Sequence, residues 1–243
     1  LTLVRDRLGV KPLYWYKNGD DFVFASEMKP IYIFPGLKKE INHNALGNFL
    51  ATQYITGPET ILNNVHKLQP GCCLVWEKGE ITITHYWSIV DAYNKGENDR
   101  NYPVPFNNAL NELDRLVTDA TRLRMISDVP IGAFLSGGID SSLITAVMQK
   151  LSDKPVKTFT IGFTDSGYDE SVYAADVSKV LGTDHTCEML PLSTAREYID
   201  LLPEYYDEPM ADQSSIATLL LSKITRKNVT VALTGDAGDE LFC

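Results

Sequence analysis

The segment Ile131-Gly-Ala-Phe-Leu-Ser-Gly-Gly-Ile-Asp-Ser-Ser142 sets the fold class expected for this chain of 243 residues. Its first five residues are all apolar or small, which is typical of a parallel strand that is buried on both faces. Ser136-Gly-Gly138 then turns the chain, and Asp140 opens a helix with an apolar face. Loop N–H groups and the positive end of a helix dipole favour phosphate. The segment therefore predicts a strand, a phosphate-binding loop and a helix.

This loop differs from two common nucleotide-binding signatures. No Lys follows the glycines, as it would in Gly-x-x-x-x-Gly-Lys, and the spacing is not that of Gly-x-Gly-x-x-Gly. Ser-Gly-Gly-x-Asp-Ser resembles the pyrophosphate-binding loop of ATP pyrophosphatases, in which the residue corresponding to Asp140 helps to bind Mg²⁺. The alternative is an ordinary glycine-rich turn with an Asp or Ser N-cap.

The sequence around this loop alternates between strands and helices. Apolar residues recur at three- and four-residue steps over residues 106–123, which predicts a helix. A capping box at Thr194 and Glu197 predicts the start of another helix. Further strands and helices are expected at residues 156–163, 170–181, 185–190, 215–227 and 229–233. The alternation predicts a doubly wound parallel sheet, an α/β fold whose ligands bind beyond the C-terminal ends of the strands.

The first part of the chain has a different pattern. Short β-like runs flank the turn signals Asn18-Gly-Asp20 and Lys78-Gly-Glu80, and a short helix is expected at residues 44–51. This region reads as antiparallel and incomplete. Residues 93–105 are polar, with one Gly and two Pro, and predict a linker. The expected domains are therefore residues 1–92 and 106–243.

A second glycine-containing loop follows the strand expected at residues 229–233. It reads Thr234-Gly-Asp-Ala-Gly-Asp-Glu240 and carries three acidic residues. Carboxylates repel a triphosphate unless a divalent cation bridges the two, so this loop suggests Mg²⁺. The alternative is an exposed acidic turn without a ligand. The predicted phosphate-binding loop favours the Mg²⁺ interpretation over this alternative.

Composition narrows the class of protein. A net charge of −10 argues against a nucleic-acid partner, which would need clustered Lys and Arg. No run reaches the roughly 18 apolar residues that span a membrane, and the chain starts without a signal-peptide pattern. Cys72, Cys73, Cys187 and Cys243 have neither metal-ligand nor disulfide spacing, which indicates reduced thiols in the cytoplasm.

Several ordered blocks identify the chain as similar to the glutamine-hydrolysing asparagine synthetases, which are class II glutamine amidotransferases. The resemblance runs through nearly all 243 residues. Its blocks are Arg5-Asp-Arg-Leu-Gly-Val-Lys-Pro-Leu-Tyr14, Phe24-Ala-Ser-Glu-Met-Lys29, Ser127-Asp-Val-Pro130, Tyr168-Asp-Glu-Ser171 and Leu181-Gly-Thr-Asp-His185. It implies a sheet of the ATP-pyrophosphatase (adenine nucleotide alpha hydrolase-like) type, preceded by part of an antiparallel α+β glutaminase domain of the Ntn type.

The resemblance also implies a site and a reaction. Its ATP-contacting positions are Leu135, Ser136, Gly137, Gly138, Asp140, Ser141, Ser142, Ile161, Thr234 and Gly235. Asp140 and Asp239 would bind Mg²⁺, and Asp236 is implicated in forming a β-aspartyl-AMP intermediate. The implied reaction joins glutamine-derived ammonia to aspartate and releases AMP and pyrophosphate. All the implied partners are small molecules, and a homodimer is compatible with the resemblance in the full-length protein.

The chain departs from the family pattern at several points. Thr234 replaces the usual Ser, and Ala237 replaces the usual Gly. The glutaminase nucleophile of the family is an N-terminal Cys, whereas this chain starts at Leu1 and ends at Cys243. We therefore expect an internal fragment that is inactive by itself.

Three alternatives stay open. A related amidotransferase or cyclase would adenylate a different carboxylate, for example in polysaccharide or β-lactam-type biosynthesis. A non-catalytic relative would act as a binding module, and a tRNA-modifying pyrophosphatase is opposed by the net charge. Among the remaining residues, His185 is expected to be structural, and Asp207-Glu208-Pro209 is interpreted as a loop whose acids cap helices.

Overall fold

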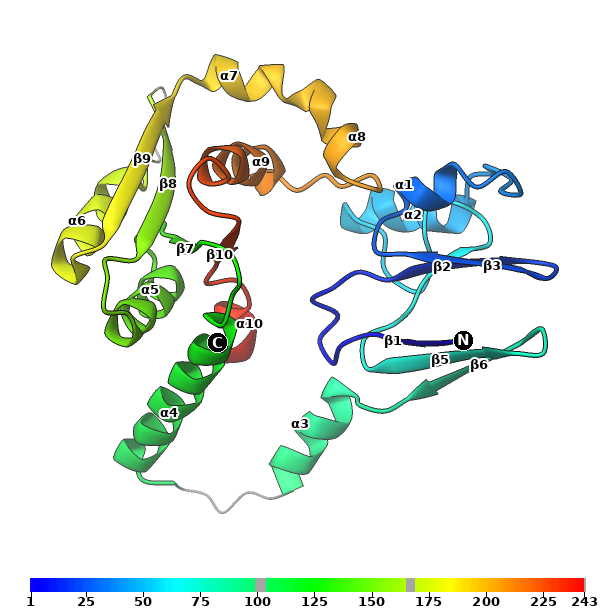
Figure 1. Cartoon of the computed structure of the whole chain (residues 1–243), viewed down its shortest axis with the longest axis horizontal. Helices are drawn as coiled ribbons and strands as arrows, with labels where there is room; N and C mark the ends of the chain where they lie inside the picture. Colours follow the sequence, from blue (N-terminus) through cyan, green and yellow to red (C-terminus); the bar gives the residue numbers. More distant parts are fainter. Residues whose placement is uncertain (99–103, 165–168, 243) are drawn as a thin grey trace. The chain divides into compact units, whose positions relative to one another are not determined.

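The computed structural model describes residues 1–98, 104–164 and 169–242 (Figure 1). The middle of the expected linker, Tyr168 of one family-like block and Cys243 lie outside the described residues. The chain divides into two compact units. Unit 1 consists of Leu1–Pro103 together with Leu201–Asp212, and unit 2 consists of Val104–Asp200 together with Gln213–Cys243.

Unit 1 contains two sheets of three strands each, and both are antiparallel, as the sequence predicts for this region. Their strands are β1 (Thr2–Val4), β2 (Tyr14–Asn18), β3 (Asp21–Ala25), β4 (Val65–Lys67), β5 (Cys72–Glu77) and β6 (Glu80–His85). The orders are β1-β5-β6 and β3-β2-β4. Lys78 and Gly79 both have positive φ, which matches the twist of the β5–β6 hairpin. The expected hairpins are confirmed, whereas the three-residue strand β1 is too short to be recognised from the sequence.

The helices of unit 1 are α1 (Lys29–Tyr32), α2 (His43–Thr52), α3 (Ile89–Asn98) and α8 (Leu202–Tyr205). The Asn42 side chain caps α2 by accepting hydrogen bonds from the N–H groups of Asn44 and Ala45. This helix confirms the prediction for residues 44–51. Helix α3 covers the first residues of the segment 93–105 that the sequence suggests as a linker.

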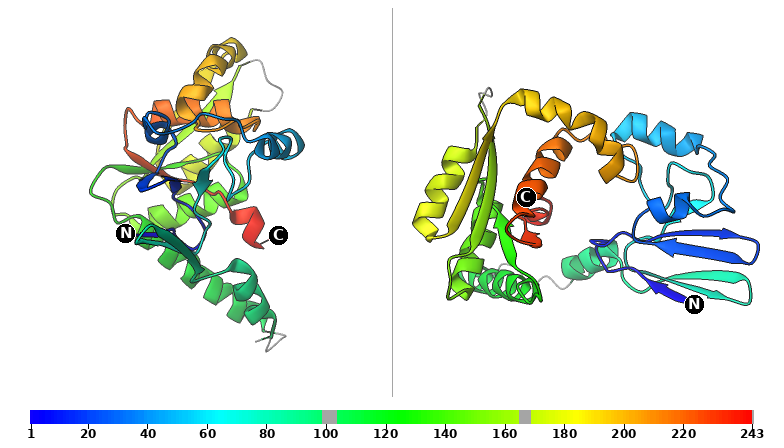
Figure 2. Two further views of the ribbon diagram at one scale, coloured as in Figure 1. Left: turned by 90° about the vertical axis from the view of Figure 1, so that its right-hand side faces the viewer. Right: turned by 45° about the horizontal axis from the view of Figure 1, so that its top comes forward.

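Unit 2 is built on a parallel sheet of four strands in the order β10-β7-β8-β9. They are β7 (Ile131–Phe134), β8 (Lys157–Phe163), β9 (Asp184–Leu190) and β10 (Val231–Leu233). Helices α5 (Ile139–Leu151) and α6 (Ser171–Leu181) lie on one face, and α9 (Ser214–Thr225) lies on the other (Figures 1 and 2). Helix α4 (Phe106–Arg124) packs against α5. The predicted parallel sheet with its alternating helices is confirmed.

The strand order explains where a ligand can bind. From β7 the chain proceeds through α5 and α6 to β8 and β9, and then returns so that β10 pairs with the opposite edge of β7. The loops that leave β7 and β10 therefore start at adjoining C-terminal strand ends. Open parallel sheets bind their ligands at such a switch point.

Two expectations in unit 2 require correction. The capping box at Thr194 is wrong, since α7 (Leu192–Glu197) begins after Pro191 and includes Thr194. The loop after β10 is not only a turn, because α10 (Gly238–Phe242) forms within it. A 3₁₀ helix, η1 (Ile199–Leu201), connects α7 with α8. Of all the helices in the described ranges, none has the length and apolar character needed to cross a membrane.

Candidate functional site

A cavity of about 680 Å³ opens in unit 2 at the C-terminal ends of β7, β8 and β10. Most of the residues that the sequence singled out line it, and they come from three separate segments. These are Leu135, Ser136, Gly138, Asp140, Ser141, Ile161, Thr234, Gly235, Asp236 and Asp239. The fold thus collects residues that are up to about a hundred positions apart into one concave surface, which is the usual form of a small-molecule site.

The loop after β7 is held by the hydroxyls of two serines. The Oγ atoms of Ser136 and Ser141 lie 2.9 Å apart. The Ser136 N–H donates to Ser141 Oγ at 3.2 Å, and the Gly138 N–H donates to Ser136 Oγ at 3.3 Å. These two loop N–H groups therefore bind serine hydroxyls. The first-turn N–H groups of α5, which have no intrahelical acceptors, are the donors best suited to an anion.

Gly137 and Ser142 do not line the cavity, unlike their neighbours. Gly137 has φ of +84°, and a Cβ atom there would lie 2.6 Å from the Tyr173 Cβ atom. Its role is therefore to bring the loop close to α6. The Ser142 hydroxyl is buried without a hydrogen-bond partner among the described residues, and the Ser142 N–H donates to the Gly138 carbonyl at 3.1 Å.

The loop after β10 packs directly against the start of α5. A Cβ atom on Gly235 would lie 2.6 Å from Ser141 N, and one on Gly238 would overlap the Asp140 carboxyl group. The two loops can approach this closely only because both positions are glycines. Ala237 has φ of +73°, a conformation that strains any residue with a Cβ atom.

The remaining wall of the cavity was missed by sequence reasoning. It includes apolar and small residues from the end of β8 and from one face of α9, namely Gly162, Phe163, Ala217, Thr218 and Leu221. The amphipathic pattern of α9 indicates a buried face but does not say that this face reaches a cavity. Asp169 and Glu170, just before α6, also line the cavity. An apolar wall beside polar loops is suited to a flat ring with a charged substituent.

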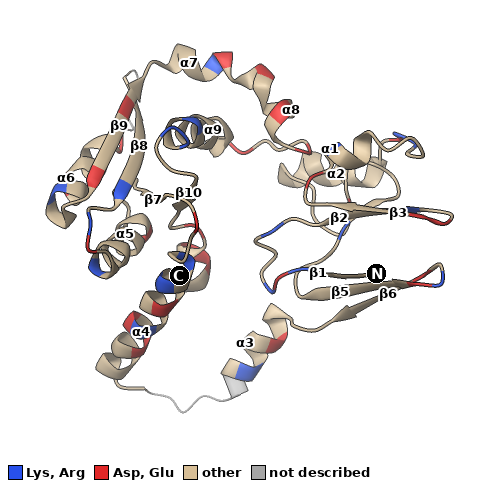
Figure 3. Ribbon diagram, in the orientation of Figure 1, with Lys and Arg blue, Asp and Glu red and all other residues tan. Residues whose placement is uncertain are grey.

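The described lining of the cavity is strongly acidic. Six carboxylates line it, from Asp140, Asp169, Glu170, Asp236, Asp239 and Glu240, and no Lys or Arg does so within the described ranges. Figure 3 shows the acidic positions on the loop that follows β10. Anionic phosphates would be repelled here unless cations accompany them.

The residues fit an Mg²⁺ ion that is shared with phosphates. No group of three or more metal-ligating side chains occurs in the described part of the chain. Mg²⁺ commonly takes only one or two carboxylates, and water and substrate phosphates complete its coordination. Asp140 and Asp239 are two carboxylates that line one cavity, which satisfies that requirement.

Comparison with known proteins places the chain in a family. The family profile described as Asparagine synthase matches residues 112–243, which is more than half of the chain, and the profile described as Glutamine amidotransferase domain matches residues 1–87. The chain belongs to the asparagine synthase family. It is 39% identical to a putative glutamine-hydrolysing asparagine synthetase 2 of Methanocaldococcus jannaschii, over 98% of this chain and 45% of that protein.

Other relatives are less similar to the chain. Asparagine synthetase 1 (glutamine-hydrolysing) of Bacillus subtilis is 33% identical, over 98% of this chain and 36% of that protein. A protein named amidase chry2, from Gibberella zeae, is 27% identical, over the whole of this chain and 37% of its own length. The chain thus spans less than half the length of these curated relatives.

Proposed function

We propose that unit 2 binds ATP and uses it to activate a carboxylate for amide formation. The observation that carries this proposal is the close contact between two loops at adjoining strand ends, where Gly235 and Gly238 pack against Ser141 and Asp140 around one cavity. A phosphate chain that enters between these loops meets helix N–H groups on one side and carboxylates on the other. The match to the Asparagine synthase profile supports the same reading.

The residues divide the work by their chemistry. The N–H groups at the start of α5 and the hydroxyls of Ser136 and Thr234 would bind phosphate oxygens, and the apolar wall with Ile161 would hold the adenine ring. Asp140 and Asp239 would hold Mg²⁺, which supplies positive charge that stabilises the leaving pyrophosphate. Asp236 would face the activated carboxylate and accept the proton that ammonia loses.

For the whole protein we propose the synthesis of asparagine from aspartate and glutamine-derived ammonia, through β-aspartyl-AMP, with release of AMP and pyrophosphate. The names of the relatives from M. jannaschii and B. subtilis support this assignment. Residues 1–92 would then form part of an Ntn-type glutaminase domain and residues 106–243 part of an ATP-pyrophosphatase domain, joined by residues 93–105. The proposed partners are small molecules, and the proposed location is the cytoplasm.

Calorimetry with full-length protein tests the nucleotide site. In the presence of Mg²⁺, wild-type protein should bind ATP, and Asp140→Ala should weaken that binding by roughly tenfold or more, since a lost metal carboxylate costs a charge-assisted contact. Asp153→Ala is the matched control, because Asp153 is an exposed acid of unit 2 that lies outside the cavity lining. Equal affinities in all three proteins would remove Asp140 from metal binding.

The two acids of the second loop should be separable by kinetics. We expect Asp236→Asn to leave ATP affinity nearly unchanged while it suppresses amide formation. Asp239→Asn should instead raise the Mg²⁺ concentration that is needed for half-maximal activity. Identical losses of ATP affinity and identical metal dependence in the two variants would show that the acids act as one metal-binding unit.

An acceptor other than aspartate is the second candidate, and the charge of the cavity favours it. Aspartate brings two carboxylates, yet the described cavity lining offers six acids and no Lys or Arg to receive them. The relative that is named an amidase also carries a different label from the synthetases. Pyrophosphate release from a panel of carboxylic acids with ATP and ammonia distinguishes the two, and no release with any acid would favour a binding module.

A further inference from the structure

Leu201–Asp212 belongs to one region of the chain by sequence and to the other by packing. It lies inside residues 112–243, which match the Asparagine synthase profile. Nevertheless it packs in unit 1, whose residues 1–87 match the Glutamine amidotransferase domain. We call Leu201–Asp212 the inserted segment. After Gln213, the chain begins α9 of unit 2 at Ser214.

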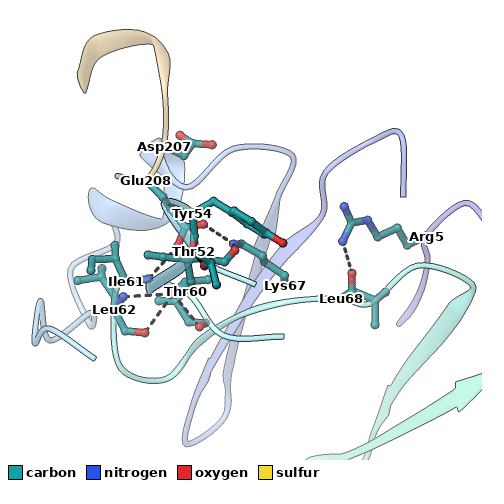
Figure 4. A network of polar contacts seen from close by, with 12 residues as sticks. Arg5, Thr52, Tyr54, Thr60, Ile61, Leu62, Lys67, Leu68, Asp207 and Glu208 are labelled. Carbon is teal, nitrogen blue, oxygen red and sulfur yellow. Dashed lines mark hydrogen bonds and ion pairs between the residues drawn. The ribbon is translucent and has the colours of Figure 1, made fainter. Parts of the chain in front are cut away.

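Glu208 is the central contact of the inserted segment (Figure 4). One of its carboxylate oxygens lies 2.5 Å from Lys67 Nζ, and the other accepts a hydrogen bond of 2.8 Å from the Ile61 N–H. Lys67 also donates to the Ile55 carbonyl at 2.6 Å. The side chains of Glu208 and Lys67 are only 10% and 15% exposed. Each charge is therefore largely removed from water and relies on these partners.

The loop that offers the Ile61 N–H is itself fixed. Thr60 is fully buried, and its hydroxyl lies 3.0 Å from the Leu62 carbonyl and 2.9 Å from the Val65 carbonyl. The Leu62 N–H donates back to the same hydroxyl at 3.2 Å. Glu208 thus docks on a preformed polar surface rather than on a mobile loop (Figure 4).

Two more residues anchor the same segment. Asp207 pairs with Lys29 at 3.1 Å, and its carbonyl accepts a hydrogen bond from the Tyr32 hydroxyl at 3.1 Å. Burial, followed by the nearby Glu208 and Asp207 carboxylates, raises the pKa of Tyr32 to about 12, so this hydroxyl stays a donor. Further along, the Ala211 N–H donates to the Gln53 carbonyl at 2.9 Å.

These contacts correct the interpretation of Asp207 and Glu208 as helix caps. Helix α8 ends at Tyr205, and the N-cap position of α9 is Gln213, so neither acid occupies a cap position. Each carboxylate is paired with a lysine, Lys29 or Lys67. Both carboxylates are thus engaged by lysines of unit 1, which indicates that they hold the inserted segment in place rather than bind a charged ligand.

We propose that Glu208 is a positioning residue for the nucleotide cavity. Glu208 holds the inserted segment against the other residues of unit 1. Because only Gln213 separates this segment from Ser214, the first residue of α9, Glu208 also restrains the start of that helix. Ala217, Thr218 and Leu221 of α9 line the cavity, and Ala217 lies in the first turn. A released segment leaves that turn free to move and the apolar wall less well ordered. The expected change in ATP affinity rests on the proposed function, whereas the attachment of the inserted segment by Glu208 does not.

Amide hydrogen exchange and ATP binding, measured on the full-length protein, test whether Glu208 holds the inserted segment and whether this positions α9. Glu208→Gln keeps the shape and the acceptor for the Ile61 N–H but removes the charge that faces Lys67. We expect exchange in residues 201–212 to accelerate by roughly tenfold or more, because one ion then remains buried without its partner. The first turn of α9 should also exchange faster, and the Kd for ATP should rise by about fivefold or more. Glu112→Gln, which breaks an exposed pair on α4, is the control that should change nothing.

Each outcome bears on a separate step. Unchanged exchange in residues 201–212 would show that the ion pair does not fasten the segment. Faster exchange there, with α9 and the ATP affinity unchanged, would overturn the positioning role. If the wild-type protein does not bind ATP, the proposed function is wrong. The exchange data would still show whether Glu208 holds the inserted segment in place. If Glu208→Gln does not fold, Glu208→Asp, whose shorter side chain cannot reach both partners, gives the same readings.

Discussion

Ala237 stands where the family pattern has Gly, and its backbone has the left-handed conformation that glycine favours. Its φ of +73° is one that glycine adopts freely, and a Cβ atom makes it costly. The position lies in the loop that contacts the start of α5, between Gly235 and Gly238. This loop therefore retains strain that a single substitution should relieve.

Ala237→Gly should raise the free energy of unfolding by about 1 kcal/mol, because the left-handed conformation strains alanine more than glycine. Ala109→Gly, in an exposed part of α4, should lower it by a similar amount, about 1 kcal/mol. Urea unfolding followed by circular dichroism measures both changes. A decrease for Ala237→Gly would mean that the loop is not strained at this residue.

His185 connects β9 to its neighbour by a polar contact, since its Nδ1 atom lies 2.9 Å from Thr158 Oγ1. Burial lowers the pKa of His185, and its Nε2 atom has no hydrogen-bond partner among the described residues. Because the folded state holds a proton less readily than the unfolded state, protonation favours unfolding. The structure supports the expectation that His185 is structural.

The stability of unit 2 should consequently fall as the pH drops below the ordinary histidine value of about 6.5. His185→Gln should flatten that dependence, whereas His43→Gln, at an exposed position, should keep the wild-type slope. Unfolding free energies measured from pH 7 down to pH 5 test this. A wild-type slope in His185→Gln would assign the pH dependence to other groups.

At the scale of elements, the site depends on how closely the loops after β7 and β10 approach. Gly235→Ala would place a Cβ atom 2.6 Å from Ser141 N and force the loops apart. We expect ATP affinity to fall by roughly tenfold or more, since a displacement of about 1 Å is enough to disrupt a preorganised site. Gly47→Ala, in the open interior of α2, is the control. Unchanged ATP affinity would show that the phosphates do not lie between these loops.

At the scale of the whole molecule, the inserted segment packs in unit 1, and the chain continues from it into unit 2. The ion pairs and hydrogen bonds described above for Asp207 and Glu208 are with residues of the first 103 positions. A polypeptide of residues 104–243 lacks those partners. Each unit should therefore be less stable when it is produced alone.

Limited proteolysis provides a direct measurement. In the polypeptide of residues 104–243, we expect cleavage within residues 201–212 at least about tenfold faster than in the longer chain, because the segment loses its anchoring contacts. The turn after α5, which is present with the same partners in both, should be cut at the same rate. Equal cleavage of residues 201–212 in the two proteins would contradict the anchoring.

The elements of unit 2 and the hairpins of unit 1 could be predicted because their signals are local. The run of apolar and small residues before Ser136 indicates β7, and Lys78-Gly79 indicates a tight turn. Neither signal depends on residues elsewhere in the chain. The order of strands and helices likewise implies that loops such as Thr234–Gly235 and Ser136–Gly138 end on the same edge of the sheet.

Contacts between distant segments could not be predicted in this way. Nothing near Glu208 indicates that it meets the Ile61 N–H, 147 positions earlier, and its neighbourhood suggested a helix cap instead. Likewise, an amphipathic pattern shows that α9 buries a face but not that Ala217 and Leu221 meet a cavity. Periodicity and turn chemistry act within a few residues, whereas pairing across the chain emerges only when packed elements bring their side chains together.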